Sequence, residues 1–404
     1  MQDMTISASP HDFSELASAM RRYVDGEILA GVSWAVLQGR DLIDVGCVGW
    51  ADRESQTALR TDHLFRVFSN TKLATTCAVM LLLEEGRLDL DEPIGLRIPQ
   101  LANMQVLKPG ATSLLQTEPA RSPITIRHLL SHCAGLSYGF LDPGTTIFEA
   151  YNERKVMNHA TTLADMMDVL ADLPLTFHPG RSWEYSVASD VLARLVEIIS
   201  GQRFDVFLQQ RIFDPLGMQD TGFAVPPEQQ HRLTAYYRGA DRANPMQPGL
   251  VRLEGAPYPG AYLSLPARLS GGGGLVSSLP DMVALIRSLL PGGTSLLKPE
   301  SIALMMRNQI ADDGNIRFAH TGDMQGKGFG LGGALTLAPS SIDPPDSTGE
   351  FQWGGIAGTH WWISPRTNLA ALVMTQRQMA FWHPFSFEFK QQVYRACRGS
   401  DLPA

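Results

Sequence analysis

The sequence predicts an α+β fold, in which an α/β sandwich lobe with an antiparallel sheet carries an inserted, mostly helical lobe. Two observations predict it. Segments rich in apolar and β-branched residues gather at both ends of the chain, and helical periodicity dominates the middle. Because both ends are rich in strands, we expect them to build one sheet together. The predicted division is residues 1–85 with 265–404 for the sheet lobe and residues 86–264 for the helical lobe, with the site between them.

The size and charge of the chain exclude several classes of protein. Its 404 residues suffice for a large buried core. The net charge is −8 without a basic run, so no nucleic-acid partner is expected. The longest apolar run, near residues 78–83, is far shorter than the roughly 18 residues of a membrane span, so no membrane partner is expected. The sequence leaves the oligomeric state open.

The N-terminal residues and the cysteines indicate the compartment. Residues 1–4 lack the basic and apolar segments of a secretory signal. The four cysteines are scattered without metal-ligand spacing, so we expect reduced thiols. Together these features predict a cytoplasmic protein, and a periplasmic location stays open if a leader has been removed. The cysteines are Cys47, Cys77, Cys133 and Cys397.

The first ninety residues alternate helix and strand. Residues 12–24 have a helical pattern, and two apolar runs at 31–37 and 41–50 are separated by a short polar turn, which predicts an antiparallel hairpin. The apolar stretch 72–85 ends before Gly86, a favourable residue for ending a helix. Because this stretch lacks a polar face until Glu84, we expect a helix buried between two layers.

The remaining elements follow from the same periodicities. Four helices are expected in the middle, at 124–131, 163–173, 187–200 and 204–212. In the last third we expect helices at 281–290 and 384–396. We expect strands there at 329–337, 349–355, 359–364 and 369–375. Long Gly/Pro-rich segments often border a functional cleft, and the chain has them at 104–123, 236–274 and 338–348.

Ser69 is the strongest candidate for a nucleophile. Its segment, Ser69-Asn70-Thr71-Lys72, lies directly before the buried helix. A hydroxyl at a helix N-terminus is near unpaired N–H groups and the positive end of the helix dipole, which favour developing negative charge. Lys72 lies three residues on, one turn away on the same face. One rigid element thus holds a hydroxyl and an amine together, as a nucleophile and its activator require.

Two other serines match short catalytic patterns. Ser295 also precedes a lysine by three residues, Lys298, but it lies between glycines and Pro299 without a long buried helix behind it. Ser137 stands in a Gly-x-Ser-x-Gly pattern, which needs a strand before it and a helix after it to form a nucleophile elbow. Here a helical segment precedes Ser137 and a turn follows. Both serines are therefore expected to be loop residues.

Lys72 needs a partner to act as a base, because an amine with a pKa of about 10.4 is almost entirely protonated at pH 7. A tyrosine beside the ammonium would have its own pKa lowered, so the two would work as a pair. Tyr185, which follows a Pro-Gly turn and precedes the helix at 187–200, is the candidate. The alternative is that Tyr185 only packs, like Tyr236 or Tyr237.

In combination, these segments resemble the serine β-lactamase and penicillin-binding-protein superfamily. The resemblance is closest to the family VIII carboxylesterases, relatives of the class C β-lactamases, and it covers about residues 20–395. It implies that Ser69 is the acylated nucleophile and that Lys72 and Tyr185 share general base and acid work. The segments that carry it are Ser69-Asn70-Thr71-Lys72, Ile126-Arg127-His128-Leu129-Leu130-Ser131-His132 with Gly135-Leu136, and Pro179-Gly180 before Tyr185-Ser186.

The resemblance also implies how the substrate is held. The segment Phe351-Gln352-Trp353-Gly354-Gly355-Ile356 takes the place of the family's third motif, on an edge strand facing the serine. It implies that the backbone N–H groups of Ser69 and Ile356 form an oxyanion hole, each donor commonly worth about 2.7–4 kcal/mol. The three residues at 353–355 would contact substrate, with glycines permitting close approach. The further candidates for the pocket wall are Tyr138, Phe140, Trp361 and Trp362.

Two departures from the lactamase pattern favour neutral esters over anionic, peptide-like substrates. Trp353 replaces the lysine of a Lys-Thr-Gly motif and supplies an apolar face, and Val187 replaces the asparagine of a Tyr-x-Asn motif. The predicted protein is a serine carboxylesterase that cleaves small, neutral, short-chain esters through an acyl-enzyme, without a metal or organic cofactor. The alternatives are an acyltransferase, a β-lactamase-like or D-aminopeptidase-like amidase, and a non-catalytic penicillin-binding-like protein.

Overall fold

The computed structural model describes residues 4–311, 314–318 and 322–398. Its centre is an antiparallel sheet in the order β12-β13-β14-β15-β16-β1-β2-β3. N-terminal β1 pairs with C-terminal β16, with Val32 opposite Thr375, so both ends of the chain build one sheet as predicted. The strands are β1 (Gly31–Gln38), β2 (Asp41–Asp52), β3 (Thr57–Ala58), β12 (Lys327–Phe329), β13 (Ala334–Thr336), β14 (Phe351–Gly355), β15 (Thr359–Ser364) and β16 (Leu369–Thr375).

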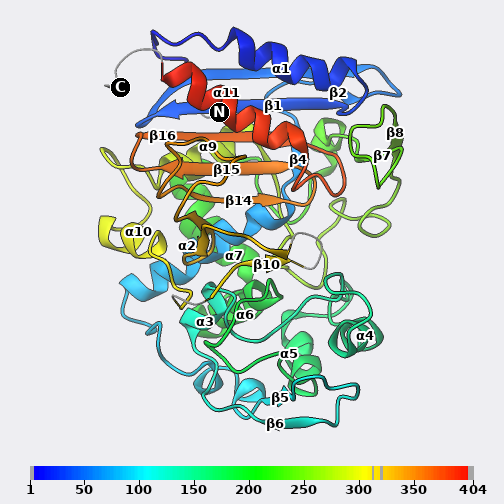
Figure 1. Cartoon of the computed structure of the whole chain (residues 1–404), viewed down its shortest axis with the longest axis vertical. Helices are drawn as coiled ribbons and strands as arrows, with labels where there is room; N and C mark the ends of the chain where they lie inside the picture. The colour runs from blue at the N-terminus through cyan, green and yellow to red at the C-terminus, as the bar shows by residue number, and fades with distance from the viewer. Residues whose placement is uncertain (1–3, 312–313, 319–321, 399–404) are drawn as a thin grey trace.

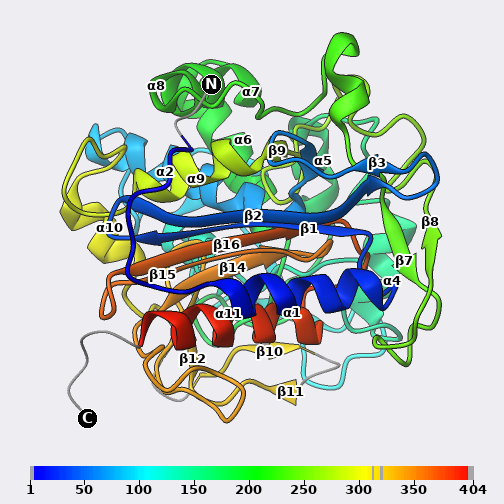
Figure 2. The ribbon, with the colours of Figure 1, turned by 90° about the horizontal axis from the view of Figure 1, so that it is seen from above.

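Helices cover both faces of this sheet. The first and last helices, α1 (Ser14–Asp25) and α11 (Pro384–Cys397), lie side by side on the outer face (Figures 1 and 2). Their apolar residues share a core with Trp34 of β1. The next residue along β1, Ala35, belongs to the core on the inner face. This period of two is what a strand between two apolar layers requires.

The inner face is covered by α2 (Thr71–Glu84) and α9 (Leu279–Arg287) (Figure 2). Most residues of α2 are buried, which confirms the expectation of a helix between two layers. Its far side packs against α6 (Ala188–Ser200), the central helix of the helical part of the molecule (Figure 1). Two parts of the chain therefore meet along α2, and the residues at its N-terminus lie near their junction.

The helical region contains the elements that follow α2 and precede β9. Its helices, besides α6, are α3 (Ile126–Leu130), α4 (Thr146–Glu153), α5 (Leu163–Ala171), α7 (Phe204–Leu208) and α8 (Asp214–Leu216), with a π turn, η4 (Gln209–Phe213), and the 3-10 turns η2 (Ile94–Leu96), η3 (Pro99–Leu101) and η5 (Pro227–Arg232). The short strands pair as β4 (Leu64–Arg66) with β9 (Val276–Ser278), β5 (Gln105–Leu107) with β6 (Thr117–Pro119), and β7 (Tyr237–Gly239) with β8 (Leu250–Arg252).

The mixture of helices with an antiparallel sheet confirms the predicted fold class. The exact lobe boundaries stay a prediction, because a segment before residue 264, within the predicted helical lobe, forms hydrogen bonds with the sheet lobe. The backbone N–H of Ala235 donates to the Ala51 carbonyl, and that of Tyr237 donates to the Gln376 carbonyl. Within the described ranges, no helix has the length and apolar character to cross a bilayer.

Some elements differ from the predictions. The single strand expected at 329–337 is two strands, β12 and β13, because Gly330 donates its N–H to Gly333 and Gly332 adopts a φ of +83°. Glycine adopts this left-handed conformation at little cost, so the glycine run makes a tight turn. The elements that were not predicted include the short strands β3 to β9, the helices α4 and α10 (Pro299–Met305), and a small hairpin of β10 (Arg317–Phe318) with β11 (Gly322–Asp323).

Candidate active site

Ser69 lies in a 3-10 turn, η1 (Phe68–Asn70), that leads directly into α2. The preceding residue, Phe68, has a φ of +42°, a conformation that costs a non-glycine residue about 1–3 kcal/mol. Its ring packs against the rings of Tyr236 and Tyr262, with ring centres 5.6 and 6.3 Å away. The surrounding aromatic residues thus hold a strained turn that fixes the position of the serine.

The three side chains predicted to work together lie in contact. The Tyr185 hydroxyl donates a 2.7 Å hydrogen bond to Ser69 Oγ. Lys72 Nζ donates to the same Oγ over 3.4 Å and lies 4.5 Å from the centre of the Tyr185 ring. Residues from a turn, a helix and a distant loop therefore place a hydroxyl, an amine and a phenol around one oxygen atom.

Lys72 has two further partners, both neutral oxygen atoms. Its Nζ donates to the Gly272 carbonyl over 2.7 Å and to the Tyr138 hydroxyl over 3.1 Å. Burial raises the pKa of Tyr138 well above its ordinary value, so this phenol keeps its proton. From the sequence, Tyr138 was expected only in the pocket wall, and no role was predicted for Gly272. The one available signal was the run of four glycines at 271–274 inside a long loop.

Tyr185 is fixed by aromatic neighbours on several sides. The indole of Trp353 lies 5.2 Å away between ring centres, and its Nε1 donates to the Tyr185 hydroxyl over 3.4 Å. Trp353 is therefore a hydrogen-bond donor as well as the apolar face predicted for it. The rings of His132 and Tyr138 lie 4.9 and 5.2 Å from that of Tyr185. Burial, with a smaller effect of Lys72, lowers the pKa of His132 well below its usual range, so this imidazole is neutral.

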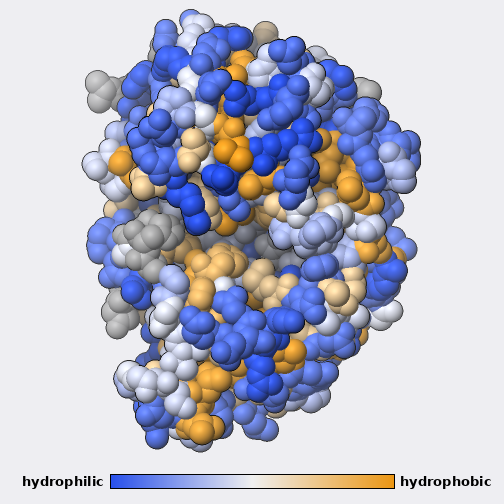
Figure 3. All heavy atoms as spheres, turned by 90° about the vertical axis from the view of Figure 1, so that its right-hand side faces the viewer, coloured by the Kyte–Doolittle hydropathy of each residue, from blue (hydrophilic) through white to orange (hydrophobic). Residues whose placement is uncertain are grey.

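Ser69 and Tyr185 line a cavity of about 490 Å³, and Lys72 is buried next to them and does not line it. Its wall is mainly aromatic and apolar, and one of its lining residues, Phe140, is 48% exposed. Figure 3 shows one face of the molecule, hollowed at its centre, with apolar surface beside the depression. The predicted residues that line the cavity are Ser69, Tyr138, Phe140, Tyr185, Trp353, Gly354 and Ile356.

The end of β14 lies against the turn that holds Ser69. A Cβ atom on Gly355 would lie 2.5 Å from the Val67 carbonyl oxygen and 2.4 Å from Thr359 Oγ1, so only glycine fits there. Gly355 is therefore required by backbone packing and does not line the cavity, in contrast to its predicted substrate contact. Ser69 and Ile356 both line the cavity, and their pairing as an oxyanion hole stays a prediction.

Two predicted pocket residues lie elsewhere. Trp362 is 2% exposed and stacks on Tyr394 of α11, with ring centres 5.1 Å apart, so it belongs to the outer core. Its predicted place in the pocket was wrong. Trp361 packs on Phe351 in the inner core, with ring centres 5.2 Å apart, and does not line the cavity. Because side chains alternate along a strand, two adjacent tryptophans on β15 necessarily face opposite sides of the sheet.

Neither alternative serine lines the cavity. Ser137 is 1% exposed, and its backbone N–H donates to the Tyr151 hydroxyl over 3.2 Å. It lies between two helices, α3 and α4, and not between a strand and a helix as a nucleophile elbow requires. Ser295 lies in the loop before α10, far along the chain from the buried helix.

Comparisons with known proteins agree with this geometry. Residues 16–381 match the family model described as Beta-lactamase. Protein Rv1367c of Mycobacterium tuberculosis is 33% identical over 367 residues, 89% of this chain and 88% of that protein. Esterase EstB of Burkholderia gladioli is 30% identical over 341 residues, 81% of each chain. The structure of EstCE1, described as a hydrolase with promiscuous acyltransferase activity, covers 95% of this chain and 97% of that one, with 26% identity and a TM-score of 0.78. The predicted resemblance is confirmed, and the chain belongs to the Beta-lactamase family as a serine hydrolase-type enzyme on the β-lactamase fold.

Proposed function

We propose that this protein is a cytoplasmic carboxylesterase of the family VIII type, which hydrolyses small neutral esters through an acyl-enzyme on Ser69. The observation that carries the proposal is the meeting of Ser69 Oγ with the Tyr185 hydroxyl and the buried Lys72 Nζ, where Ser69 and Tyr185 line an apolar cavity. A nucleophile within hydrogen-bond reach of its base is the arrangement that covalent acyl transfer requires. Nucleic acid and membrane have no part in the proposed reaction.

The proposed reaction has two halves. In the first, the Lys72/Tyr185 pair takes the Ser69 proton while Oγ attacks the ester carbonyl carbon, and the carbonyl oxygen becomes an oxyanion held by the backbone N–H groups of Ser69 and Ile356. The oxyanion then collapses, the bond from carbon to the alcohol oxygen breaks, and the pair gives its proton to that oxygen. In the second half, water gives a proton to the pair and attacks the acyl carbon, and Ser69 leaves with the proton.

The cavity wall supports a neutral, apolar ester as substrate. Trp353 presents an indole where a lactamase would present a lysine, so this position of the wall offers no cation for a substrate carboxylate. Arg268 also lines the cavity, and its charge is paired with Asp190. A short acyl chain is our prediction from the sequence. Since about 490 Å³ exceeds the needs of a small acyl group, the remaining volume would hold the alcohol portion of the ester. A series of p-nitrophenyl esters of increasing acyl length tests the predicted preference for short chains.

An acyltransferase is the second candidate, favoured by the likeness to EstCE1, whose description includes acyltransferase activity. In that reaction, an alcohol in the cavity would replace water in the second half. Product analysis with an added alcohol acceptor separates the two. Mainly free acid at high acceptor concentration supports the esterase, whereas mainly the new ester supports the transferase.

The decisive experiment compares Ser69→Ala with Ser295→Ala and Ser137→Ala, using a short p-nitrophenyl ester. We expect Ser69→Ala to abolish hydrolysis and both other variants to retain most of the rate. Intact mass measurement after brief exposure to ester should show an acyl adduct in the wild type that decays with turnover and is absent from Ser69→Ala. An adduct that persists without turnover would instead indicate a non-catalytic penicillin-binding-like protein. Faster turnover of a matched amide than of the ester would indicate an amidase.

A further inference from the structure

A buried ion pair lies beside Lys72 and takes no part in the reaction steps proposed above. Asp190 on α6 is 1% exposed, and Arg268, in the loop before β9, is 8% exposed. The Arg268 Nη1 atom lies 3.6 Å from Asp190 Oδ1, and Nη2 donates to the Met157 carbonyl over 2.7 Å. Burying two charges carries a desolvation cost that their attraction often fails to recover. The pair is therefore weak as a stabilising device, and its position suggests a functional role.

Gly272 connects the ion pair to the site. Its carbonyl accepts the 2.7 Å hydrogen bond from Lys72 Nζ. A Cβ atom on Gly272 would lie 2.8 Å from Asp190 Oδ2, 2.8 Å from the Tyr138 hydroxyl and 3.4 Å from Lys72 Nζ. The carboxylate and the amine thus surround the same small space, with only a glycine between them. Asp190 is a near neighbour of Lys72, while the atoms that bond Nζ directly are neutral oxygens.

The charge of Asp190 matters for a base. An unopposed carboxylate at this position would favour the ammonium form of Lys72, and an ammonium cannot accept the Ser69 proton. In a buried site of low effective dielectric constant, such an interaction is large even beyond direct contact. Arg268 supplies a positive charge 3.6 Å from Asp190, which opposes the effect of that carboxylate on Lys72.

The other groups around Lys72 add little charge at neutral pH. From the loop after α3, His132 is held neutral by burial, with a pKa well below its usual range. Tyr138 is held as a phenol, since burial raises its pKa well above the ordinary value, with Asp190 raising it further and Arg268 opposing that effect. Asp190 and Arg268 therefore both act electrostatically on a direct partner of Lys72.

We propose that Arg268 is a positioning residue that neutralises Asp190 and thereby allows the Lys72/Tyr185 pair to serve as a base at neutral pH. This inference rests on the proposed esterase function. In this inference, Arg268 and Asp190 take no part in the reaction steps but control the pH range in which the enzyme works.

The test is the pH dependence of kcat/KM for a short p-nitrophenyl ester in four variants. Because Arg268→Met leaves Asp190 unopposed, the acidic limb of the profile should move up by about one pH unit or more. Asp190→Asn removes the negative charge, so the limb should move down by a similar amount. The double variant should return the limb close to its wild-type position. Arg268→Lys, which keeps the charge, should leave it unchanged.

Arg268→Met and Asp190→Asn should move the acidic limb in opposite directions, which a purely structural role of the ion pair would not produce. Lower rates with an unmoved acidic limb in both single variants would overturn the inference. If thermal melting shows that Arg268→Met does not fold, the other two single variants decide the question. The inference then requires a downward shift of the acidic limb in Asp190→Asn and an unmoved limb in Arg268→Lys. Ser69→Ala distinguishes a failure of the proposed esterase mechanism from a failure of the role proposed for Arg268. Retained hydrolysis in Ser69→Ala refutes the esterase mechanism itself, whereas an inactive Ser69→Ala with an unmoved limb refutes only the role of Arg268.

Discussion

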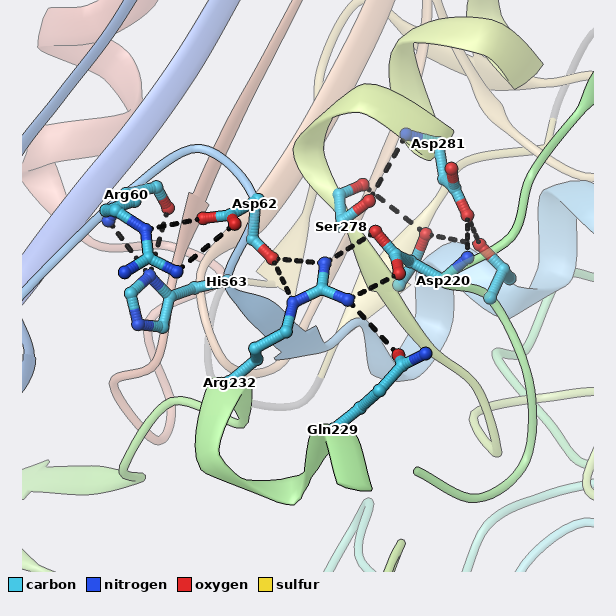
Figure 4. A network of polar contacts seen from close by, with 10 residues as sticks. Arg60, Asp62, His63, Asp220, Gln229, Arg232, Ser278 and Asp281 are labelled. Atoms are coloured by element: carbon cyan, nitrogen blue, oxygen red, sulfur yellow. Dashed lines mark hydrogen bonds and ion pairs between the residues drawn. The ribbon is translucent and has the colours of Figure 1, made fainter. Parts of the chain in front are cut away.

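The Asp281 carboxyl is a buried acid whose replacement should stabilise the protein. Figure 4 shows its surroundings, in which Asp220 and Arg232 form an ion pair with a 2.7 Å contact. Asp281 Oδ2 accepts hydrogen bonds from the Asp220 backbone N–H over 2.7 Å and from the Thr221 hydroxyl over 2.8 Å. An asparagine placed here would keep a carbonyl oxygen for both donors and lose the charge. We therefore expect Asp281→Asn to preserve the hydrogen bonds and remove the cost of burying a carboxylate.

The structure gives the size and sign of the effect. Burial raises the pKa of Asp281 from 3.8 to about 6. A shift of about two units corresponds to about 3 kcal/mol, at 1.36 kcal/mol per unit. Because the folded state binds this proton more tightly than the unfolded state, the contribution of Asp281 to stability is fully present below pH 3.8 and is lost as pH rises through about 6. Asp281→Asn should therefore match the wild type near pH 4 and exceed its free energy of unfolding by about 3 kcal/mol at pH 7.

Urea unfolding at pH 4 and pH 7 checks this expectation. Asp220→Asn is the matched control on the same network, since it breaks the ion pair with Arg232 and should destabilise the protein by about 1–3 kcal/mol at pH 7. If Asp281→Asn is less stable than the wild type at pH 7, or if the difference between the two is the same at both pH values, the reasoning from the buried charge is wrong.

Three further predictions concern the site and are checked by steady-state kinetics on a p-nitrophenyl ester. Tyr185→Phe keeps the ring contacts but loses the hydroxyl bonded to Ser69, so kcat should fall by about 10²–10⁴ with little change in KM, and a kcat near the wild-type value would refute its role. Gly272→Ala places a Cβ atom 2.8 Å from the Tyr138 hydroxyl and should lower kcat by about 10- to 100-fold, whereas Gly222→Ala, with its nearest neighbour at 3.7 Å, should not. Trp353→Phe removes the donor to Tyr185 and should lower kcat about three- to tenfold, while Trp362→Phe in the outer core should affect only the melting temperature.

The parts of the site that depend on local spacing could be predicted from the sequence. A serine three residues before a lysine at the start of a buried helix places both on one face, whatever the rest of the chain does. The strands at 359–364 and 369–375 have the predicted bounds because each contains a run of apolar residues, 361–363 and 369–374, and the polar turn 365–368 separates them. In these segments the local pattern and the final fold require the same structure.

The parts that depend on contacts between distant segments could not. Asp190, Arg268 and Gly272 come from one helix and one irregular loop, and no local pattern indicates that they meet beside Lys72. The error on Trp362 has a different cause. Central strands that are buried on both faces lack the alternation of apolar and polar residues that would show which side chains face inward. With apolar residues at 361–363, the sequence did not reveal which tryptophan lies on which face.

The pairing of β1 with β16 has a consequence for biosynthesis. Val32 lies opposite Thr375, so the central sheet joins residues from the first and last tenths of the chain. During translation, the N-terminal hairpin leaves the ribosome long before its neighbouring strand exists, and it presents an unpaired edge until nearly the whole polypeptide has been made. Closing so long a loop is entropically slow, and exposed strand edges invite self-association. We therefore expect refolding to be slow and to depend on protein concentration, and a chain truncated before residue 369 to aggregate.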